Sequence, residues 1–392
     1  MDTQKDILII AGEPSGDLHG ANLAQELWKL DPALTLRGLG GEKMLLSGVK
    51  LYFNIVELAG IGISEVFKNI ARLRQVFKEL VAIIEKAKPK AIVLIDFPEF
   101  NLRLAKEMHR LKIPIIYYIS PQVWAWRRGR VKTISRYVKK MLVIFPFEEE
   151  FYRRLGISVE FVGHPLLDMA MPQKGKSMLK DVLQIEEDKV VIGLLPGSRE
   201  SEVKKHLPVM LGTAKIIGRQ IPRVQFVLPI NSSLSEKFFT SMMNLNERVL
   251  VRLLPGQSSE VMGAADLVLV ASGTATLEAA RHSCPMVIIY KISFLTWLFV
   301  RPLIRVPYVG LVNLIAGKKI VPEYLQFQAN PGRIARECLN LLKNDEKREE
   351  MVDNLRLVRH NLGEPGASEQ AARAVLNIIR DKKITTEHTE KR

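Results

Sequence analysis

Short runs of apolar residues alternate with longer amphipathic stretches along most of the chain. The runs are rich in Val, Ile and Leu, and few polar residues interrupt them, as in AIVLIDF at 91–97. Continuous apolar strands separated by helices are typical of a parallel sheet that is covered on both faces. The pattern predicts strands at 6–12, 34–40, 91–97, 114–120, 141–146 and 159–163 in the first half, and at 190–197, 224–230, 249–255, 266–272 and 286–290 in the second.

Because both halves show this alternation, two domains are predicted. A chain of 392 residues also exceeds what one hydrophobic core usually supports. The segment 164–188 is polar and contains Pro165 and Pro172, so we expect a linker there. Residues 332–380 have a helical pattern. The predicted fold class is α/β, with two Rossmann-like doubly wound domains facing a cleft, where ligands bind outside the carboxyl ends of the strands.

The formal net charge of +15 predicts an anionic partner, such as nucleic acid, a membrane surface or a phosphorylated substrate. General solubility is the alternative explanation. No basic run alternates with aromatic residues as in a nucleic-acid module, which argues against nucleic acid. Cys284 and Cys338 form neither a disulfide framework nor a metal pair, so a reducing, cytoplasmic setting is expected. No signal peptide is indicated, and no apolar run reaches the ~18 residues of a membrane span.

The first predicted strand ends in AGEPSGD at 11–17. The glycines and Ser15 allow a tight turn and a close approach of the backbone to a ligand. The carboxylates of Glu13 and Asp17 would repel phosphate, so the turn suits sugar hydroxyls or acid–base chemistry. Helix capping by Ser15 or Asp17 is the alternative. His19 is close in sequence, and a structural role for it is slightly favoured over a catalytic one.

Asp96 is the first polar residue after the apolar run AIVLI. Its neighbours Ile95 and Phe97 would partly desolvate the carboxylate and raise its pKa, which suits a general base. The alternative is that Asp96 or Asn101 only caps the next helix.

In the second half, LLPGSRESEV at 194–203 predicts an anion site. Backbone amides after Gly197, the hydroxyl of Ser198 and the guanidinium of Arg199 converge before a predicted helix. Helix capping is again the alternative.

VLVASGTATLEAA at 268–280 ends a strand in a loop of small residues that enters a helix. Small side chains let a phosphate approach the amides of the first turn, and the helix dipole favours its charge. Glu278 leans back toward that end of the helix and can reach ligand hydroxyls. The stretch therefore predicts a site for a nucleoside diphosphate, with a plain Ser/Thr cap as the alternative. The loop consists of Ser272, Gly273, Thr274, Ala275 and Thr276.

Several common site motifs are missing from the sequence. No GxGxxG follows the first strand and no GxxxxGK[ST] occurs, which argues against a dinucleotide dehydrogenase and a P-loop enzyme. There is also no Asp-x-Asp pair and no HExxH. Neither a metal nor a cofactor is expected.

Two amphipathic stretches are candidates for contact with a lipid surface. One is 64–84, in which apolar residues recur at helical spacing opposite lysines and arginines; the other is 294–305. The core face of a helix that covers a sheet is the alternative for both. Trp124 and Trp126 stand beside arginines in SPQVWAWRRGR at 120–130, where they could bind lipid or phosphate or simply pack.

Seven motifs in one order resemble the bacterial lipid-A-disaccharide synthase family, glycosyltransferases with two Rossmann-like domains (the GT-B type). The resemblance covers roughly residues 6–378. Its motifs are AGEPSGDLHGA (11–21), IDFPEFN (95–101), SPQVWAWR (120–127), FVGHPLLD (161–168), LLPGSRESEV (194–203), ASGTATLEAA (271–280) and YVGLVNLIAG (308–317).

The resemblance implies a reaction. Family members transfer 2,3-diacylglucosamine from UDP-2,3-diacylglucosamine to 2,3-diacylglucosamine 1-phosphate (lipid X), and release UDP with inversion at the anomeric carbon. It also implies that the enzyme is peripheral at the cytoplasmic face of the inner membrane. The oligomeric state stays open, and a homo-oligomer is compatible with it.

The resemblance also implies roles for residues. Asp96 matches the general base, with Glu13 and then His19 as the other candidates. Ser198, Arg199 and the amides of 272–276 would stabilise the leaving diphosphate without a metal, and Glu278 would hold the ribose. Other polar positions of the cleft are Asn313, Gln370, Ser15 and Asn101.

Two positions depart from the family's pattern, which usually has Asp where Glu99 stands and Pro where Val312 stands. Pattern and resemblance together predict an acceptor- and lipid-binding domain at 1–168, a linker at 169–188 and a UDP-sugar-binding domain at 189–345. Helices at 346–380 would return toward the first domain, before a charged tail at 381–392.

Two further explanations stay open at this point. One is a different UDP-sugar enzyme of the same fold, such as a UDP-N-acetylglucosamine 2-epimerase or a lipid II-type N-acetylglucosaminyltransferase. The other is a basic protein without catalytic activity that binds nucleic acid or membranes.

Overall fold

The structure is a computed structural model that describes residues 6–54, 66–125, 129–172, 174–230, 234–243, 250–293, 297–298 and 306–389, with the backbone alone at 66–70 and 381–389. The chain folds into two compact units. The first comprises Met1–Met169 and Leu362–Arg392, and the second comprises Ala170–Asn361. Both units are α/β, as the alternating pattern predicts.

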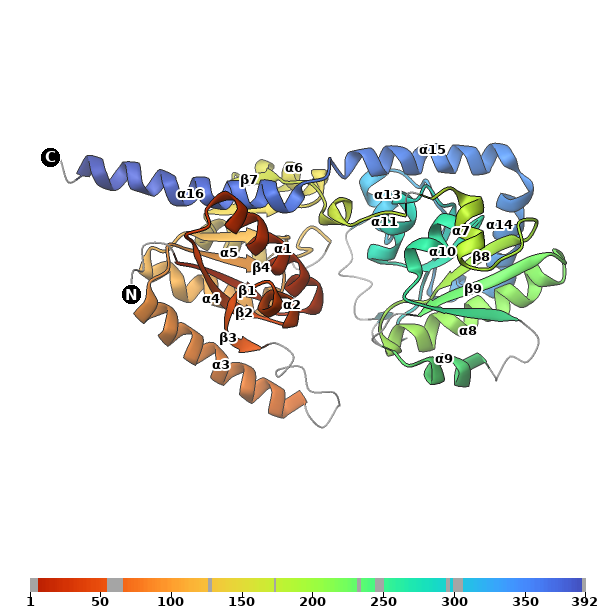
Figure 1. Ribbon diagram of the computed structural model, residues 1–392, viewed down its shortest axis with the longest axis horizontal. Helices are drawn as coiled ribbons and strands as arrows, with labels where there is room; N and C mark the ends of the chain where they lie inside the picture. The colour runs from red at the N-terminus through yellow and green to blue at the C-terminus, as the bar shows by residue number, and fades with distance from the viewer. Residues whose placement is uncertain are drawn as a thin grey trace. The chain divides into compact units, whose positions relative to one another are not determined.

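Seven strands of the described residues form one parallel sheet in the first unit, in the order β3-β2-β1-β4-β5-β6-β7 (Figure 1). The strand order reverses between β1 and β4, because β2 lies on one side of β1 and β4 on the other. In doubly wound sheets this switch point is where ligands bind. The strands are β1 (Asp6–Ala11), β2 (Thr35–Gly40), β3 (Lys50–Asn54), β4 (Ala91–Ile95), β5 (Ile115–Tyr118), β6 (Lys140–Val143) and β7 (Val159–Phe161).

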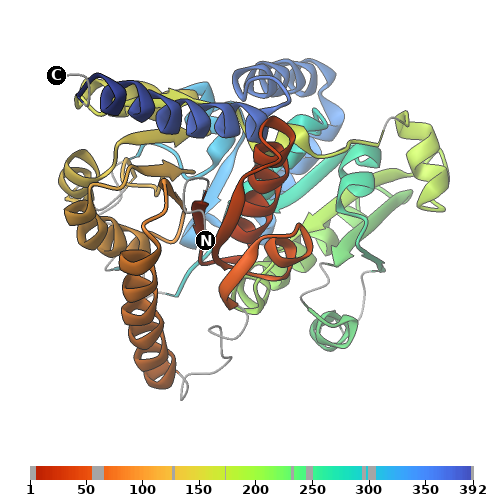
Figure 2. The same ribbon diagram turned by 60° about the vertical axis from the view of Figure 1, so that its left-hand side comes forward.

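Helices cover this first sheet, and one of them comes from the end of the chain. α16 packs against α1 and returns the chain to the first unit (Figure 2). The helices are α1 (Pro14–Leu30), α2 (Glu42–Leu46), α3 (Val66–Ala87), α4 (Pro98–Met108), α5 (Arg130–Tyr137), α6 (Pro146–Arg154) and α16 (Ala367–Thr389), with short 3-10 turns at His109–Leu111 and Pro165–Asp168.

The amphipathic stretch at 64–84 forms much of α3. Leu80 and Ile84 are fully buried in the core of the first unit, and Leu73 and Phe77 pack against that core. The ring of Phe77 meets that of Phe100 on α4 edge to face, with centroids 5.3 Å apart. The apolar side chains of α3 that the structure describes therefore face the core of the first unit. This is the alternative that the sequence left open beside contact with a lipid surface.

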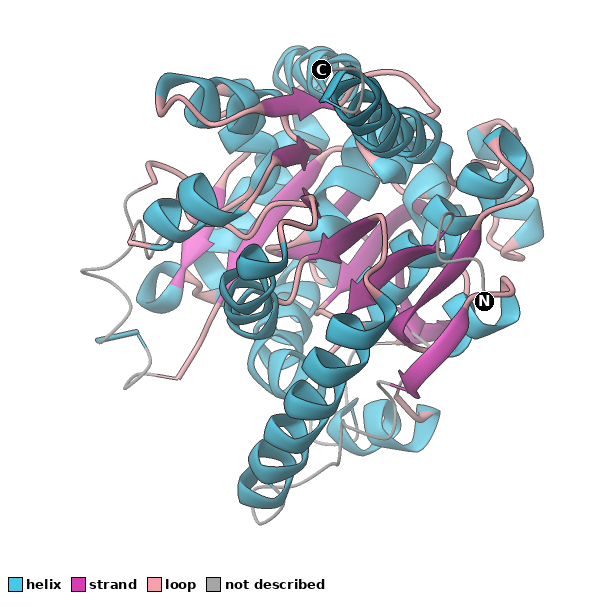
Figure 3. Ribbon diagram, turned by 90° about the vertical axis from the view of Figure 1, so that its left-hand side faces the viewer, coloured by secondary structure: helices cyan, strands magenta, loops and turns pink. Residues whose placement is uncertain are grey.

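The second unit also contains one parallel sheet, of six strands among the described residues, in the order β10-β9-β8-β11-β12-β13. Figure 3 shows the strands in magenta among the helices in cyan. Here the order reverses between β8 and β11, which pair through Leu195 and Val270. The strands are β8 (Val190–Leu195), β9 (Val224–Ile230), β10 (Val251–Pro255), β11 (Leu267–Ala271), β12 (Met286–Tyr290) and β13 (Glu323–Leu325).

Along the chain, helices alternate with most of the strands of the second unit, as expected for a doubly wound fold. α8 and α14 pack against each other, as do α11 and α15. The helices are α7 (Lys176–Val182), α8 (Glu200–Gly218), α9 (Glu236–Met243), α10 (Ser258–Ala264), α11 (Thr274–Arg281), α13 (Leu311–Ala316), α14 (Pro331–Lys343) and α15 (Asp345–Asn361), with a 3-10 turn at Gln326–Gln328.

The eleven strands predicted from apolar runs all occur, but β3 and β13 were not predicted. Both are edge strands, and their side chains are only partly buried. A strand with one free edge and half-exposed faces carries no continuous apolar run, so the criterion used for the buried strands could not detect it.

The unit boundaries differ from the sequence-based ones in two places. Residues 170–188, expected as a linker, contain α7 and belong to the second unit. Lys180 of α7 donates from Nζ to the carbonyl oxygens of Glu187 and Lys189, at 2.5 and 2.9 Å. α15 also belongs to the second unit, so only α16 returns to the first, and its backbone continues through much of the charged tail to Thr389.

None of the helices in the described residues is long and apolar enough to cross a membrane. The second apolar segment, 294–305, lies almost entirely outside the described residues, as do Trp126 and the two arginines that follow it.

Candidate functional site

Glu13 and Asp96 follow the two strands that flank the switch point of the first sheet. Ala11 at the end of β1 pairs with Ile95 at the end of β4, so the residues after these strands leave the sheet side by side. Gly12 is required between them, because a Cβ there would come within 2.0 Å of the Phe97 ring. The two acids therefore follow neighbouring strands at the same edge of the sheet.

The backbone at Asp96 is held in an uncommon conformation. Asp96 and Phe97 have φ of +43° and +47°, a region that side chains with a Cβ rarely adopt. The carbonyl oxygen of Asp96 accepts hydrogen bonds from Asn101 Nδ2 at 2.7 Å and from the Tyr117 hydroxyl at 2.5 Å. Strain of this kind persists where the surroundings over-determine it, and it clusters at active sites.

The carboxyl of Asp96 has the electrostatics of a general base. Its pKa is raised to about 6, chiefly by burial and also by the negative charge of Glu13, while a hydrogen bond from the Phe97 amide opposes the shift. At neutral pH the group is mostly ionised, yet it binds a proton more strongly than an exposed Asp. A base with a pKa near the working pH suits proton abstraction from an alcohol.

Helix capping, the alternative role for several of these residues, is not what the structure shows at α1 and α4. Asp17 accepts hydrogen bonds from the amides of Gly41, Lys43 and Met44, at 2.6, 2.9 and 3.1 Å, so it caps α2 rather than α1. Ser15 is exposed in the first turn of α1.

Asn101 also differs from the sequence-based expectations. It is fully buried and uses its amide to hold the carbonyl oxygens of Ile95 and Asp96. It neither caps α4, whose N-cap residue is Phe97, nor presents its amide NH₂ to a ligand. Its role is to support the turn that carries Asp96.

His19 is partly buried and lies close to the charges of Lys43 and Asp168. Its pKa is lowered to about 4, chiefly by burial and also by the positive charge of Lys43, while Asp168 opposes the shift. The carboxylate of Asp168 accepts hydrogen bonds from the amides of Gly366, Ala367 and Ser368 and so fixes the start of α16. Gln370, one turn further along α16, is exposed.

Glu148 is a second acid near Asp96 that sequence reasoning missed. It is almost fully buried in the first turn of α6, where Oε1 accepts from Trp124 Nε1 at 2.9 Å and Oε2 from the Phe145 amide at 3.2 Å. Its pKa is raised to about 8, chiefly by burial; these hydrogen bonds oppose the shift, and the charge of Asp96 adds to it. In the sequence, Glu148 is hidden within the acidic run FEEE.

In the second unit, the two predicted anion-binding loops also flank a switch point. The loop with Ser198 and Arg199 follows β8, and the loop 272–276 follows the neighbouring β11. Both side chains of the first loop are exposed. The parallel register therefore brings to one edge two segments that are more than seventy residues apart.

One feature of the first loop corrects the sequence-based expectation. The carboxylate of Glu202 accepts hydrogen bonds from the amides of Ser198 and Arg199, at 3.1 and 3.4 Å, and caps α8. Gly197 makes this possible, because it has φ +115° and a Cβ would come within 2.4 Å of Glu202. These two amides are therefore engaged within the protein, and what the loop exposes are the side chains of Ser198 and Arg199.

In the second loop, two of the residues that were expected to offer amides lie in the first turn of a helix. Thr274 and Ala275 begin α11, and the first amides of a helix have no carbonyl within the helix to donate to. Thr276 differs from the expectation, because its hydroxyl and its amide both donate to the carbonyl oxygen of Gly273, at 2.7 and 3.1 Å. Ser272 donates its hydroxyl to the carbonyl oxygen of Val309 at 2.9 Å.

Glu278 lies one turn into α11 and is partly buried. Burial raises its pKa, and the positive charge of Arg281 opposes the shift. A partly desolvated carboxylate can accept hydrogen bonds from hydroxyl groups.

Asn313 was expected to be a polar position of a ligand site, but the structure uses all of its hydrogen-bonding capacity internally. Nδ2 donates to the carbonyl oxygen of Val321 at 3.0 Å and to Glu323 Oε1 at 2.7 Å. Oδ1 accepts from the amides of Ile320 and Val321, at 2.8 and 3.0 Å. An amide with two donors and two acceptors in use has nothing left for a ligand.

Asn313 instead supports the second loop through Glu323. Glu323 accepts hydrogen bonds from the amides of Val309 and Gly310, at 3.0 and 2.9 Å. The carbonyl of Val309 in turn accepts from Ser272. Glu323 was not singled out in the sequence because it lies on β13, the edge strand that has no apolar run.

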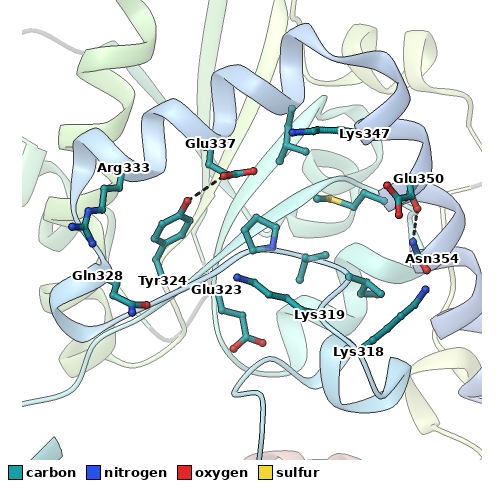
Figure 4. A pocket seen from close by; sticks show the side chains of 15 residues that line it. Lys318, Lys319, Glu323, Tyr324, Gln328, Arg333, Glu337, Lys347, Glu350 and Asn354 are labelled. Carbon is teal, nitrogen blue, oxygen red and sulfur yellow. Dashed lines mark hydrogen bonds between the residues drawn. The ribbon is translucent and has the colours of Figure 1, made fainter.

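The pocket in Figure 4, about 500 Å³ in volume, is formed by the segment around β13 together with α14 and α15. None of the sequence-predicted site residues lines it. Its cationic side chains, Lys318, Lys319, Arg333 and Lys347, spread around it rather than converging. Among the described residues, no group of three or more His, Cys, Asp or Glu side chains could hold a metal ion.

The chain matches known proteins over nearly its whole length. The family model described as lipid-A-disaccharide synthetase matches residues 7–378. Lipid-A-disaccharide synthase from Syntrophus aciditrophicus (strain SB) is 43% identical over 376 residues, which cover 96% of this chain and 98% of that protein. The same enzyme from Myxococcus xanthus (strain DK1622) is 41% identical over 373 residues, covering 95% of this chain and 97% of the relative.

Solved structures share the fold. A UDP-GlcNAc 2-epimerase from Neisseria meningitidis bound to UDP-GlcNAc superposes with a TM-score of 0.65 at 14% identity, covering 95% of this chain and all of that one. At this identity the likeness concerns the fold alone. The family model and the relatives, by contrast, cover the strand-end motifs of both units, and the chain belongs to the lipid-A-disaccharide synthase family of glycosyltransferases.

Proposed function

We propose that this protein transfers 2,3-diacylglucosamine from UDP-2,3-diacylglucosamine to the 6-hydroxyl of lipid X, forming the β-1,6-linked disaccharide 1-phosphate and UDP. Membership of the family supports this reaction. The observation that carries the mechanism is the carboxyl of Asp96. It lies at the switch point of the first sheet on an over-determined turn, and its pKa is raised to about 6.

In the proposed step, the acceptor oxygen forms a bond to the anomeric carbon while the bond from that carbon to the UDP oxygen breaks. The proton of the acceptor hydroxyl passes to Asp96, and the electron pair of the broken bond stays on UDP. Attack from the face opposite to UDP gives inversion. Glu13 keeps the proton affinity of Asp96 high through its charge.

The second unit stabilises the leaving diphosphate in this proposal. The exposed guanidinium of Arg199 and the first-turn amides of Thr274 and Ala275 offer positive charge and donors where the negative charge develops. Glu278 accepts hydrogen bonds from the ribose. No step requires a group that these residues do not supply.

Replacing Asp96 with Asn tests the base. The Asp96→Asn variant should lose at least about 99% of UDP release in the presence of lipid X, because general-base catalysis contributes about 10²–10⁴-fold. Its dissociation constant for UDP, measured by calorimetry, should match that of the unmodified protein. An exposed acid, changed in the same way in Asp353→Asn, is the control. Near-normal turnover of Asp96→Asn would reject this assignment and make Glu13 the candidate.

The nucleotide site is tested by separate variants. Arg199→Ala and Glu278→Ala should each weaken UDP binding by about tenfold, as expected for the loss of a charged hydrogen-bond partner. Arg219→Ala removes the same charge at the other end of α8 and should leave UDP binding unchanged. Release of UDP that does not depend on lipid X would point to a different UDP-sugar reaction.

We also propose that the enzyme acts as a peripheral protein at the cytoplasmic face of the inner membrane. The net charge of +15 and the acylated substrates of the proposed reaction support this. Co-sedimentation with vesicles that contain anionic lipid should exceed that with neutral vesicles, and it should fall as the salt concentration rises. Equal binding to both kinds of vesicle would contradict the electrostatic part of the proposal.

A further inference from the structure

His206 lies on α8 and is almost fully buried. Its Nδ1 lies 2.8 Å from the carbonyl oxygen of Pro196, and its Nε2 accepts a hydrogen bond from the amide of Lys291 at 2.9 Å. Pro196 follows β8 directly and precedes the loop with Ser198 and Arg199. The ring therefore holds the backbone of the loop to which the proposed function assigns the leaving diphosphate.

The two partners of the His206 ring follow different strands of the second sheet. Lys291 directly follows β12, and β11 lies between β8 and β12. The imidazole thus bridges two segments that leave the sheet on either side of β11. The loop that follows β11 is the one with the first-turn amides of Thr274 and Ala275. One side chain links both neighbours of that loop.

The two partners of His206 determine its tautomer. An amide N–H only donates, so Nε2 must carry a lone pair toward Lys291, whereas a carbonyl oxygen only accepts, so Nδ1 must carry the proton toward Pro196. The ring is neutral with the proton on Nδ1. A second proton would place an N–H of Nε2 against the N–H of Lys291, and this bond would be lost.

The surroundings favour the neutral ring. Burial lowers the pKa of His206, the hydrogen bond to Pro196 and the charge of Glu202 raise it, and the charges of Lys205 and Lys291 lower it. The ring of Tyr290 packs on the other side, with its centroid at 6.3 Å. The net effect is a pKa below the usual value for histidine.

We propose that His206 is a positioning residue of the nucleotide site, which as the neutral Nδ1–H tautomer holds the loop 196–199 in the conformation that presents Ser198 and Arg199 to the diphosphate. This inference rests on the proposed UDP-binding role of that loop. His206 itself touches neither substrate. A purely structural role, in which the ring only anchors α8, is the competing explanation.

Three substitutions separate the two hydrogen bonds. In His206→Asn, the side-chain amide can occupy the place of Nδ1 and donate to Pro196, while Lys291 loses its acceptor. In His206→Gln, the amide oxygen can reach the place of Nε2 and accept from Lys291, while Pro196 loses its donor. His206→Phe fills the ring volume and makes neither bond.

The dissociation constant for UDP, measured by calorimetry at pH 7.5, should rise in the variants that lose the hydrogen bond to Pro196 and change little in the variant that keeps it. We expect His206→Gln and His206→Phe to weaken UDP binding by about tenfold, and His206→Asn by less than about threefold, as suits the loss or retention of one buried hydrogen bond. Unfolding by urea should show that Asn and Gln lower stability by similar amounts. Equal UDP affinities in Asn and Gln, or an unchanged affinity in Phe, would overturn the proposal.

The pH dependence gives a second test of which hydrogen bond matters. Between pH 7.5 and 5, the UDP affinity of the unmodified protein should change relative to that of His206→Asn by less than about threefold, because a second proton on the ring opposes only the Lys291 bond and leaves the donor to Pro196 in place. Comparing the two proteins on the same ligand removes the contribution of the phosphate groups of UDP, which titrate at about pH 6. A much larger relative loss of affinity in the unmodified protein would show that the Lys291 bond controls the loop and would contradict the proposal. His360→Asn, an exposed histidine of the second unit, is the control.

The Arg199→Ala variant separates a failure of this inference from a failure of the proposed function. If Arg199→Ala leaves UDP binding unchanged, the loop is not the nucleotide site and both ideas fail. If Arg199→Ala weakens UDP binding but His206→Gln does not, the nucleotide site stands and only the positioning role of His206 is wrong.

Discussion

Asn101 Nδ2 donates a hydrogen bond to the carbonyl oxygen of Asp96 at 2.7 Å, and so a side chain on α4 determines the backbone of the proposed base. The hydroxyl of Tyr117 donates to the same oxygen from β5. The two donors hold a turn with two successive positive φ angles, at Asp96 and Phe97. The orientation of the carboxyl thus depends on two residues that do not take part in the proposed proton transfer.

Asn101→Ala removes one of these donors and is expected to relax the turn. Turnover should fall by about tenfold or more, because small displacements of a catalytic group are costly, and the free energy of unfolding should fall by about 1–3 kcal/mol. UDP binding should not change, since Asn101 belongs to the first unit. Steady-state rates, calorimetry and urea unfolding measure the three quantities. Asn361→Ala, at an exposed position, is the control, and full turnover in Asn101→Ala would contradict the supporting role.

The pKa of Asp96 predicts the acid limb of the pH–rate profile. The carboxyl must be ionised to accept a proton, so turnover at saturating substrate should rise with pH and level off above a pKa of about 6. Substrate binding can move this value. A rate that is independent of pH between 5 and 7 would show that another group accepts the proton.

Asp96 should also make the protein less stable as pH rises. Its pKa is raised in the folded state from 3.8 to about 6, so the folded protein holds a proton that the unfolded chain releases. The favourable contribution is complete below pH 3.8 and is lost as pH rises through about 6, which amounts to about 3 kcal/mol. Asp96→Asn should therefore be more stable than the unmodified protein at pH 8 and lose this advantage near pH 4. Urea unfolding at both values tests this, and a constant difference would contradict it.

Glu202 places a negative charge beside the loop that is proposed to hold the diphosphate. Glu202→Gln keeps an acceptor for the amides of Ser198 and Arg199 but removes the charge. We expect UDP to bind about threefold more tightly, with a smaller gain at high salt, because exposed charges are screened. Glu200→Gln removes the charge of a neighbouring carboxylate that pairs with Lys204 instead of accepting from these amides, and it is the comparison. Weaker binding in Glu202→Gln would show that the carboxylate is needed to shape the loop.

Asn313→Ala should destabilise the second unit. It removes four hydrogen bonds of a buried side chain and leaves Glu323 and the amides of Ile320 and Val321 without that partner. The free energy of unfolding should fall by about 2–4 kcal/mol. UDP binding should weaken only a few-fold, through the contacts of Glu323 with the segment that holds Ser272. Urea unfolding and calorimetry measure both, and a variant as stable as the unmodified protein would contradict the buried network.

The sequence by itself determined which stretches form the sheets and which strand ends carry polar groups. Buried parallel strands need continuous apolar runs, and a polar residue at the end of such a run is visible in one dimension, as at Asp96 and at Ser272. Local patterns are sufficient for these features, because the requirement of burial acts on consecutive residues.

Only the tertiary structure decided which of these polar groups face outward. Glu202 captures the amides of Ser198 and Arg199, Asn313 turns inward to Glu323, and His206 joins β8 to β12 across β11. Hydrogen bonds between residues that are distant in sequence depend on the strand order and register of the whole sheet. No local pattern records them, because each partner alone looks like an ordinary polar residue.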